Sequence, residues 1–347
     1  MTMKKMETRT DCIRRKNTMS KPELILRADA DRSEWMETRK LGIGGSDCAT
    51  VLGLNPYQSA YTLAAERLGM VEPDDLSKNP RVWFGTALEP IVAARFEDLT
   101  GKKVHRRGTL RDPDHPYMLA NIDRWVEGEK VGLEIKTADA RMARFWGDKD
   151  DFEDPTVPDG YYCQCMHYMA VTGAPYWYLA VLIGGNDYRC KVINRNEEEI
   201  EYIRREEGAF WDMRQKRELP PIDGTASTGA TIEKLHSRAS AADIPVLEDP
   251  YAMAALSAYW EAKAAEKTAK EAEQDAKNKL MNLIGDNEMV FIDNGKGDRF
   301  KVTWKNQSRE TLSLSKLKKS APSIYKLAKE QGLITISSSR IMRIPTV

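Results

Sequence analysis

The stretch NIDRWVEGEKVGLEIKT, residues 121–137, decides the fold of this chain. It predicts two strands joined by a tight turn at Glu-Gly-Glu-Lys, residues 127–130. We expect Asp123 near the middle of the first strand, with Glu134 and Lys136 two positions apart on the second. Because side chains alternate along a strand, Glu134 and Lys136 should share one face, and the turn should bring Asp123 beside them.

Two carboxylates and a lysine at one point of a sheet predict metal-assisted hydrolysis of a phosphodiester. Asp123 and Glu134 supply the hard oxygen ligands that Mg²⁺ or Mn²⁺ prefers, and the backbone carbonyl of Ile135 can add another. A bound metal would polarise the phosphate and lower the pKa of a water molecule. Lys136 would hold or deprotonate that water and offset charge at phosphorus. A Glu-x-Lys pattern alone is usually a surface ion pair, so the prediction depends on the aspartate at hairpin distance.

A glycine-rich stretch, GIGGSD at residues 42–47, leads into a predicted short helix. No Gly-Lys-Ser/Thr follows it, so it is not a nucleotide-binding P-loop. We expect Ser46 to cap the helix, and the free N–H groups of the first turn attract anions. Arg39 would add a charge-assisted contact. The stretch is therefore either an ordinary capped helix beside a surface arginine or a phosphate pocket.

Composition and charge limit the class of protein. The chain has 347 residues, 41% of them apolar and 31% charged, which is typical of a soluble globular protein. No apolar run is long enough to cross a membrane, and the first twenty residues lack the apolar core of a secretory signal. The five cysteines are scattered and form no Cys-x-x-Cys pair, which favours free thiols in a reducing cytoplasm.

The net charge of zero hides an uneven distribution. Residues 1–20 carry six basic and two acidic side chains, and residues 291–347 carry twelve and four, so residues 21–290 carry −12. The basic ends are either solvated tails or arms that lie near a polyanion.

The pattern of elements predicts an α/β fold with an appended C-terminal region. We expect a basic, disordered N-terminal extension at 1–20, a mixed central sheet flanked by helices at 21–222, and a linker at 223–250, which is rich in Gly, Ser, Thr and Ala. The Ala/Glu/Lys-rich segment 251–285 predicts a long helix compatible with a coiled coil. Residues 286–347 predict a small basic module with a hairpin turning at Asn294-Gly295 and one short helix within 316–332.

The order of these motifs resembles a known nuclease family. Asp…Glu-x-Lys is the pattern of the PD-(D/E)xK superfamily. The stretch from 35 to 57, the helix around "ALEP", the hairpin and "QCMHYMAVTG" follow the order of YqaJ-like viral recombinase nucleases, which are similar to lambda exonuclease. The resemblance covers about residues 33–215 and implies a PD-(D/E)xK, restriction-endonuclease-like core. Ile122 stands where the superfamily name has proline.

The resemblance also implies roles for further residues. Glu89 matches the helix glutamate that faces the metal site, and Gln164 matches the glutamine that points toward it from the next helix. Arg39 and Ser46 match the pair that grips the 5′-phosphate at a DNA end. We interpret His167, one turn after Gln164, as a packing or substrate-side residue rather than a ligand.

The function implied is a phage or prophage recombination exonuclease in the cytoplasm of a bacterial host. It would use Mg²⁺ or Mn²⁺, with two ions, to digest linear double-stranded DNA 5′→3′ and leave 3′ overhangs. The family further implies a ring-like trimer and a partner protein that anneals the single strand. Two alternatives stay open: an endonuclease or RecB-like repair nuclease, and a non-enzymatic DNA-end scaffold that works through residues 251–347.

Overall fold

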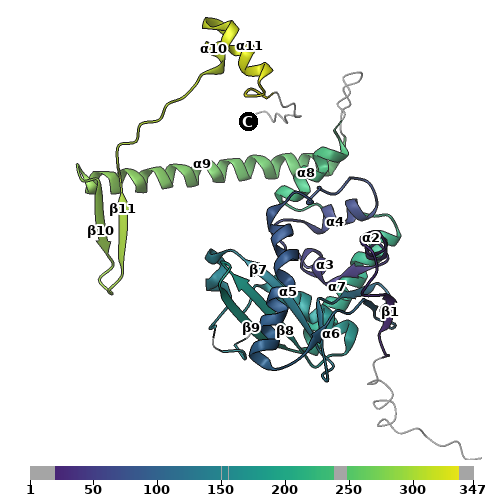
Figure 1. Ribbon diagram of the computed structural model, residues 1–347. Coiled ribbons are helices and arrows are strands. Elements are labelled where there is room, and N and C mark those ends of the chain that lie inside the picture. Colours follow the sequence, from purple (N-terminus) through teal and green to yellow (C-terminus); the bar gives the residue numbers. More distant parts are fainter. Residues whose placement is uncertain (1–19, 150, 155, 238–247, 336–347) are drawn as a thin grey trace, which may run out of the picture. The chain divides into compact units, whose positions relative to one another are not determined.

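The computed structural model describes residues 20–149, 151–154, 156–237 and 248–335 (Figure 1). The predicted disorder of residues 1–19 therefore lies outside the described residues. The chain divides into two compact units, one ending at His236 and the other beginning at Ser237. Among the described residues, no helix is long and apolar enough to cross a membrane.

The centre of the first unit is a five-stranded mixed sheet. Strands β7 and β8 run parallel, whereas the other neighbouring strands are antiparallel. The order across the sheet is β3 (Val104–His105), β6 (Arg124–Val126), β7 (Gly132–Ala138), β8 (Tyr176–Ile183) and β9 (Asp187–Asn194).

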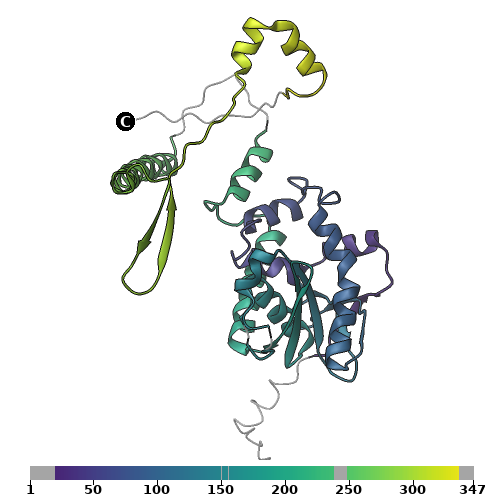
Figure 2. The ribbon, with the colours of Figure 1, turned by 60° about the vertical axis from the view of Figure 1, so that its left-hand side comes forward.

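Helices cover both faces of this sheet. Helix α5 (Pro80–Thr100) lies on one face, and α6 (Asp159–Thr172) and α7 (Glu197–Gln215) lie on the other (Figure 2). Gly101 and Gly173 end α5 and α6 with φ of +69° and +71°, a conformation that glycine adopts without strain. The predicted mixed α/β fold, a central mixed sheet flanked by helices, is confirmed.

The prediction of one continuous strand through Asp123 is wrong. Strand β5 (Met118–Asn121) ends before Asp123, and β6 begins after it. Asp123 lies in the bend between them, where its side chain accepts the main-chain N–H of Ile135. Strand β5 belongs to a second sheet, whose order is β1 (Glu23–Leu26), β4 (Thr109–Arg111), β5 and β2 (Ile43–Gly44).

Three short helices follow β1. They are α2 (Arg32–Arg39), α3 (Gly45–Val51) and α4 (Ala60–Arg67). The expectation that Ser46 caps α3 is wrong, because the helix already begins at Gly45 and the main-chain N–H of Gly44 donates to Asp47. Gly45 allows α3 to approach α6, since a Cβ there would lie 2.6 Å from the Tyr168 ring.

Part of the predicted linker is helical. Helix α8 (Ala226–Leu235) is joined to α4 by hydroxyl hydrogen bonds, including 2.8 Å from Thr62 Oγ1 to Ser227 Oγ and 2.7 Å from Thr228 Oγ1 to Ser59 Oγ. Residues 238–247 of the predicted linker lie outside the described residues. A 3₁₀ helix, η1 (Ala140–Phe145), follows β7.

The second unit has almost no interior of its own. Its long helix α9 (Pro250–Ile284) ends at Gly285, and among the described residues of this unit only Ile284 is buried. A hairpin, β10 (Met289–Asp293) and β11 (Arg299–Thr303), follows it. The expected single short helix is instead two, α10 (Leu314–Ser320) and α11 (Pro322–Glu330), because Pro322 cannot continue α10 and starts α11.

The close contact of α3 with α6 predicts an effect of Gly45→Ala. The new methyl group would press on the Tyr168 ring, so we expect a loss of about 1–3 kcal/mol in the free energy of unfolding. Denaturant unfolding measures it. The matched control is Gly229→Ala in α8, where an added Cβ meets nothing within 4 Å. Equal stability of the two variants would show that the α3–α6 contact is looser than described.

Candidate active site

One cleft of about 380 Å³ in the first unit gathers the residues singled out from the sequence. They come from the helices α2, α3, α5 and α6, from strand β7 and from the bend that precedes β6. These elements are far apart in the chain. We call it the carboxylate cleft. Its lining includes all eight candidate residues: Arg39, Ser46, Glu89, Asp123, Glu134, Ile135, Lys136 and Gln164.

Asp123 is fixed by the backbone of β7. Its Oδ2 accepts the Ile135 N–H at 2.9 Å, which takes the place of the hydrogen bond that a continuing strand would have made. Burial and the neighbouring Glu134 carboxylate raise the pKa of Asp123 well above its usual value. The N–H and C=O of one strand residue point to the same edge, so the Ile135 carbonyl faces the same side as Asp123.

Glu134 is almost fully buried and only partly satisfied. Its Oε1 accepts hydrogen bonds from the Lys136 ammonium and from Gln164 Nε2, the latter at 2.6 Å. Its Oε2 is buried without a hydrogen-bond partner among the described residues. Burial alone would lower the pKa of Lys136, but the Glu134 and Asp123 carboxylates outweigh it and raise the pKa.

Glu89 reaches the cleft from α5. Its carboxylate forms an ion pair with Arg124, whose guanidinium also donates to the Asp123 carbonyl at 2.6 Å. Sequence reasoning missed Arg124, and its place directly after Asp123 was the available signal. Arg124 ties the bend that carries Asp123 to the helix that carries Glu89.

A tyrosine completes the support on the α6 side. The Tyr168 hydroxyl accepts from Gln164 Nε2 and donates to the Asn121 carbonyl, both at 2.8 Å. Tyr168 stands one turn after Gln164, so helical spacing could have identified it. The chain of hydrogen bonds from Asn121 through Tyr168 and Gln164 to Glu134 joins the end of β5 to β7.

Arg39 and Ser46 lie next to each other in the lining of the cleft. Arg39 Nη2 is 3.4 Å from Ser46 Oγ and 3.3 Å from Asp47 Oδ1, and its guanidinium lies over the Trp35 ring. Asp47 also accepts from Arg67 at 2.6 Å. Two arginines therefore share one carboxylate, which leaves positive charge in excess here.

His167 is not part of this cleft. It is fully buried, with Nδ1 2.8 Å from Glu207 Oε1 and Nε2 2.9 Å from the Leu119 carbonyl. Candidate ligand atoms of Cys48, His167 and Glu207 lie within 4.8 Å of one another. Because both ring nitrogens of His167 already have partners, the geometry favours the packing role over the substrate-side one.

The donor set of the carboxylate cleft fits a divalent cation. The buried Glu134 and the half-buried Asp123 lie side by side with one lysine, and one oxygen of Glu134 lacks a partner among the residues described. A cation bound there would satisfy Glu134 Oε2 and relieve the repulsion that raises the pKa of Asp123. The ligand types are oxygen atoms, as Mg²⁺ and Mn²⁺ prefer.

Comparisons with known proteins agree on one family. Residues 34–175 match the YqaJ-like viral recombinase domain. Protein YqaJ of Bacillus subtilis (strain 168) is 33% identical over 322 residues, which cover 90% of this chain and 96% of that protein. The chain belongs to the YqaJ-like viral recombinase family.

More distant similarities cover less of the chain. A protein of African swine fever virus (strain Badajoz 1971 Vero-adapted) is 36% identical over 87 residues, which are 23% of this chain and 25% of that protein. Among solved structures, the alkaline exonuclease LHK-Exo from Laribacter hongkongensis aligns with 53% of this chain and 93% of its own. That alignment has 21% identity and a TM-score of 0.43.

The raised pKa of Asp123 predicts that Asp123→Asn stabilises the metal-free protein. Above this pKa the ionised carboxylate repels Glu134, and an amide can still accept the Ile135 N–H. In chelator at neutral pH, we expect the variant's free energy of unfolding to exceed that of the wild type by about 1 kcal/mol, which corresponds to a rise in Tm of about 2–4 °C. The difference in stability between the variant and the wild type should shrink as the pH falls through the raised pKa. Below this pKa the Asp123 carboxyl of the wild-type protein is protonated and no longer repels Glu134.

Metal provides the control for this thermal measurement. Mn²⁺ should raise the Tm of the wild-type protein and leave that of Asp123→Asn nearly unchanged. A variant that is less stable than wild type in chelator at every pH would contradict the assignment of the charge repulsion.

Proposed function

We propose that this protein is a metal-dependent exodeoxyribonuclease that digests linear double-stranded DNA 5′→3′ and leaves 3′ single strands for recombination. The observation that carries the proposal is the convergence of Asp123, Glu134 and Lys136 in one cleft with the Arg39–Ser46 pair. Two carboxylates and an amine suit metal-assisted hydrolysis, and an arginine with a hydroxyl suits a terminal phosphate. Membership of the YqaJ-like family supports the same function.

Asp123, Glu134 and the Ile135 carbonyl would hold the metal, and Glu89 would serve a second ion. Bound Mg²⁺ or Mn²⁺ would supply Lewis acidity and a water molecule of lowered pKa. Two observations support this assignment: Glu134 Oε2 has no hydrogen-bond partner in the described part of the chain, and the Ile135 carbonyl faces the side of Asp123. Arg124 holds Glu89 beside Asp123, so the two carboxylates keep a fixed separation.

Lys136 acts on the attacking water and the phosphate. Its ammonium lies against Glu134, which aims it into the cleft. Once positive charge offsets Glu134 and Asp123, the pKa of Lys136 falls from its raised value, because those carboxylates are what raise it. A Lys136 side chain that has released its own proton to solvent can take the proton of the attacking water. In its protonated form it can instead donate to the oxygens of the phosphate as negative charge develops. Gln164 keeps the Glu134 carboxylate oriented through Oε1.

The polarity follows from the Arg39–Ser46 pair. Arg39 would bind the 5′-phosphate of a strand end, with Ser46 as a second hydrogen-bond donor. The scissile bond one nucleotide inward would then reach the carboxylates. Each release creates a new 5′-phosphate, which occupies the same place, so digestion advances 5′→3′.

The family resemblance also suggests a ring-like trimer, an annealing partner protein and a bacterial cytoplasmic location. These remain predictions. The second unit has almost no interior, which supports a role in assembly or partner binding. Its hairpin leaves Phe291 and Phe300 exposed, and its helix α11 leaves Leu327 exposed.

Lys136→Ala tests the hydrolytic assignment. We expect the rate of digestion to fall at least about 100-fold, the size of a general acid–base contribution, while DNA binding stays close to wild type. A gel of labelled linear duplex in Mg²⁺ gives the rate, and a mobility shift in chelator gives the binding. The control is Lys103→Ala, at an exposed lysine paired with Glu97. Normal digestion by Lys136→Ala would show that the catalytic residues lie elsewhere.

End dependence is a separate test. Removing the 5′-phosphate from a linear duplex should slow digestion about tenfold or more, equivalent to the loss of a charge-assisted contact. In Arg39→Ala the two substrates should be digested at the same slow rate. Covalently closed circular DNA should stay intact. Cleavage of the circle would favour the endonuclease alternative, and faster digestion from a free 3′ end than from a free 5′ end would reverse the proposed polarity.

A further inference from the structure

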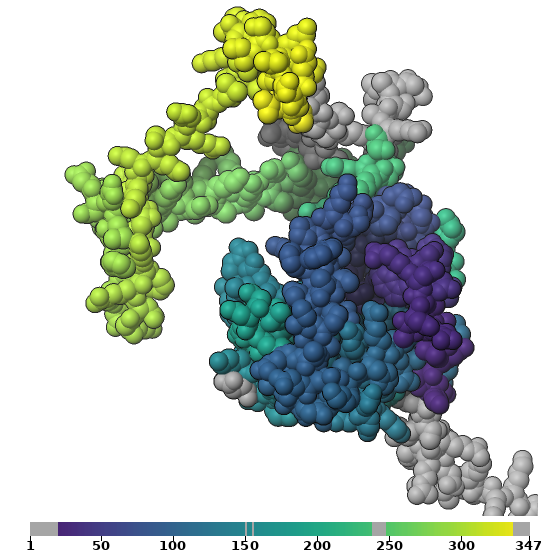
Figure 3. Space-filling view, viewed as in Figure 1, coloured from purple at the N-terminus to yellow at the C-terminus, as the bar shows by residue number. Residues whose placement is uncertain are grey.

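A second cleft, of about 420 Å³, adjoins the carboxylate cleft. Figure 3 shows the surface hollowed between the blue α5 and the purple segment that carries β1 and α2. The two clefts share a wall on which both Asp123 and Glu89 stand. The residues common to both linings are Trp35, Thr86, Glu89, Asn121 and Asp123.

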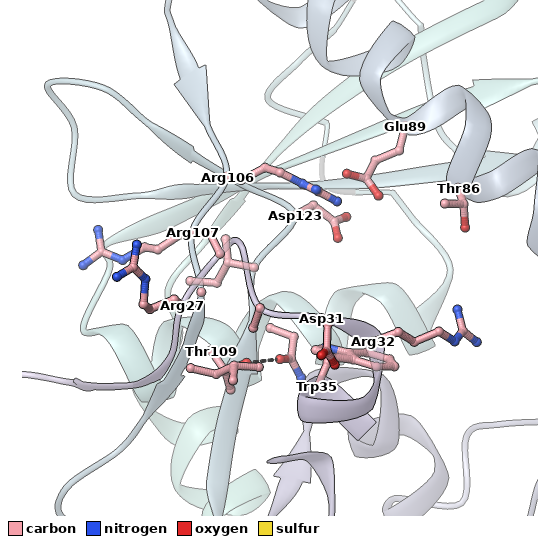
Figure 4. A pocket seen from close by; sticks show the side chains of 16 residues that line it. Arg27, Asp31, Arg32, Trp35, Thr86, Glu89, Arg106, Arg107, Thr109 and Asp123 are labelled. Carbon is pink, nitrogen blue, oxygen red and sulfur yellow. Dashed lines mark hydrogen bonds between the residues drawn. The ribbon is translucent and has the colours of Figure 1, made fainter. Parts of the chain in front are cut away.

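Four arginines line this second cleft, which we call the arginine cleft: Arg27, Arg32, Arg106 and Arg107. Arg27 pairs with the exposed Asp29, and Arg107 lies over the Trp125 ring at 4.4 Å. Within the part of the chain that the structure describes, neither Arg32 nor Arg106 forms an ion pair with a carboxylate. In Figure 4 the Arg106 side chain reaches toward the carboxylates of Asp123 and Glu89.

Main-chain contacts bring together the segments that carry Arg27, Arg106 and Arg107. The turn that carries Arg106 and Arg107 lies against the end of β1, where Leu26 pairs with Thr109. Gly108 makes this possible, because a Cβ there would lie 1.8 Å from the Leu26 carbonyl oxygen. Arg27 follows Leu26 directly, so the same contact brings Arg27 and Arg107 into one cleft, as Figure 4 shows.

Apart from the shared wall, the two clefts are lined by different residues. Arg39, Ser46 and Lys136 line only the carboxylate cleft, and the four arginines line only the arginine cleft. A strand whose 5′-phosphate is at Arg39 and whose scissile phosphate is at Asp123 therefore has an arginine-lined continuation beyond Asp123. Arginine binds phosphate oxygens through two N–H groups at once, which suits it to a nucleic-acid backbone.

We propose that the arginine cleft holds the phosphates of the digested strand on the 3′ side of the scissile bond, with Arg32 and Arg106 as the principal contacts. This assignment rests on the proposed exonuclease function. Electrostatics supports the same assignment. Asp123, Glu134 and Glu89 repel a polyanion, and positive charges beside them reduce that repulsion. Arg32 and Arg106 act here as binding residues and take no part in the chemical step.

The test combines a double variant with a neutral linkage in the DNA. Arg32→Gln/Arg106→Gln removes both charges, and Arg205→Gln on α7, which lines neither cleft, is the matched control. The probe is a 5′-phosphorylated duplex with one methylphosphonate at the linkage directly 3′ of the scissile one. Initial release of the 5′-terminal nucleotide in Mg²⁺ gives kcat and KM for each protein and each duplex.

We expect the wild-type protein and the control to show a KM about tenfold higher on the methylphosphonate duplex, as for the loss of about 1.4 kcal/mol of contact. The double variant should have that raised KM already on the ordinary duplex, with less than about twofold added by the methylphosphonate, because both changes remove one interaction. Its kcat should stay within about threefold of wild type, since neither arginine acts in the chemical step. For the double variant, the slope of log KM against log salt concentration should be smaller than for the wild type by about 1–2.

Two results would overturn the inference while leaving the proposed function intact. One is a double variant whose KM on the ordinary duplex equals that of the wild type. The other is a double variant whose KM is raised on the ordinary duplex and rises about tenfold further on the methylphosphonate duplex. A wild-type protein that releases no nucleotide from the ordinary duplex in Mg²⁺ would instead refute the proposed function, and the inference with it. Unfolding curves of the double variant and Arg205→Gln should coincide, since Arg32, Arg106 and Arg205 are all exposed.

Discussion

A single hydrogen bond, from the main-chain N–H of Ile135 to the carboxylate of Asp123, organises the rest of this structure. It replaces a ladder bond at the point where the chain leaves one sheet and enters the other. The bend therefore carries a carboxylate instead of a strand residue, and that carboxylate stands beside Glu134. Everything proposed for the chemistry depends on this position, because it is where three acidic side chains, one lysine and two clefts meet.

The carboxylate cleft places acidic side chains where they are shielded from solvent, which costs folding stability. Glu134 is nearly inaccessible to solvent and keeps one oxygen without a partner among the described residues, and burial raises the pKa of Asp123. Buried carboxylates in this state cost stability unless a counter-charge arrives. By contrast, the buried His167–Glu207 pair is hydrogen-bonded at both ring nitrogens and ties α6 to α7 and β5. The difference between the two clusters separates a site suited to a ligand from one that holds the fold.

Local sequence patterns were enough to predict much of this. Alternation along one strand placed Glu134 and Lys136 on one face, and composition predicted the long helix that became α9. The break at Asp123 could not be predicted, because residues 118–126 contain neither Pro nor Gly and read as one strand. Helix α8 looked like a linker by composition, but its hydroxyl groups bond to α4. Arg32 and Arg106 were missed because the pairing of β1 with β4, which is distant in sequence, brings their segments together.

Anomalous diffraction from crystals grown with Mn²⁺ tests most directly whether the carboxylate cleft binds divalent metal. We predict a peak about 2.0–2.3 Å from oxygen atoms of Asp123, Glu134 and the Ile135 carbonyl. Absence of density there at saturating Mn²⁺, with a peak instead at Cys48, His167 and Glu207, would contradict metal binding in this cleft.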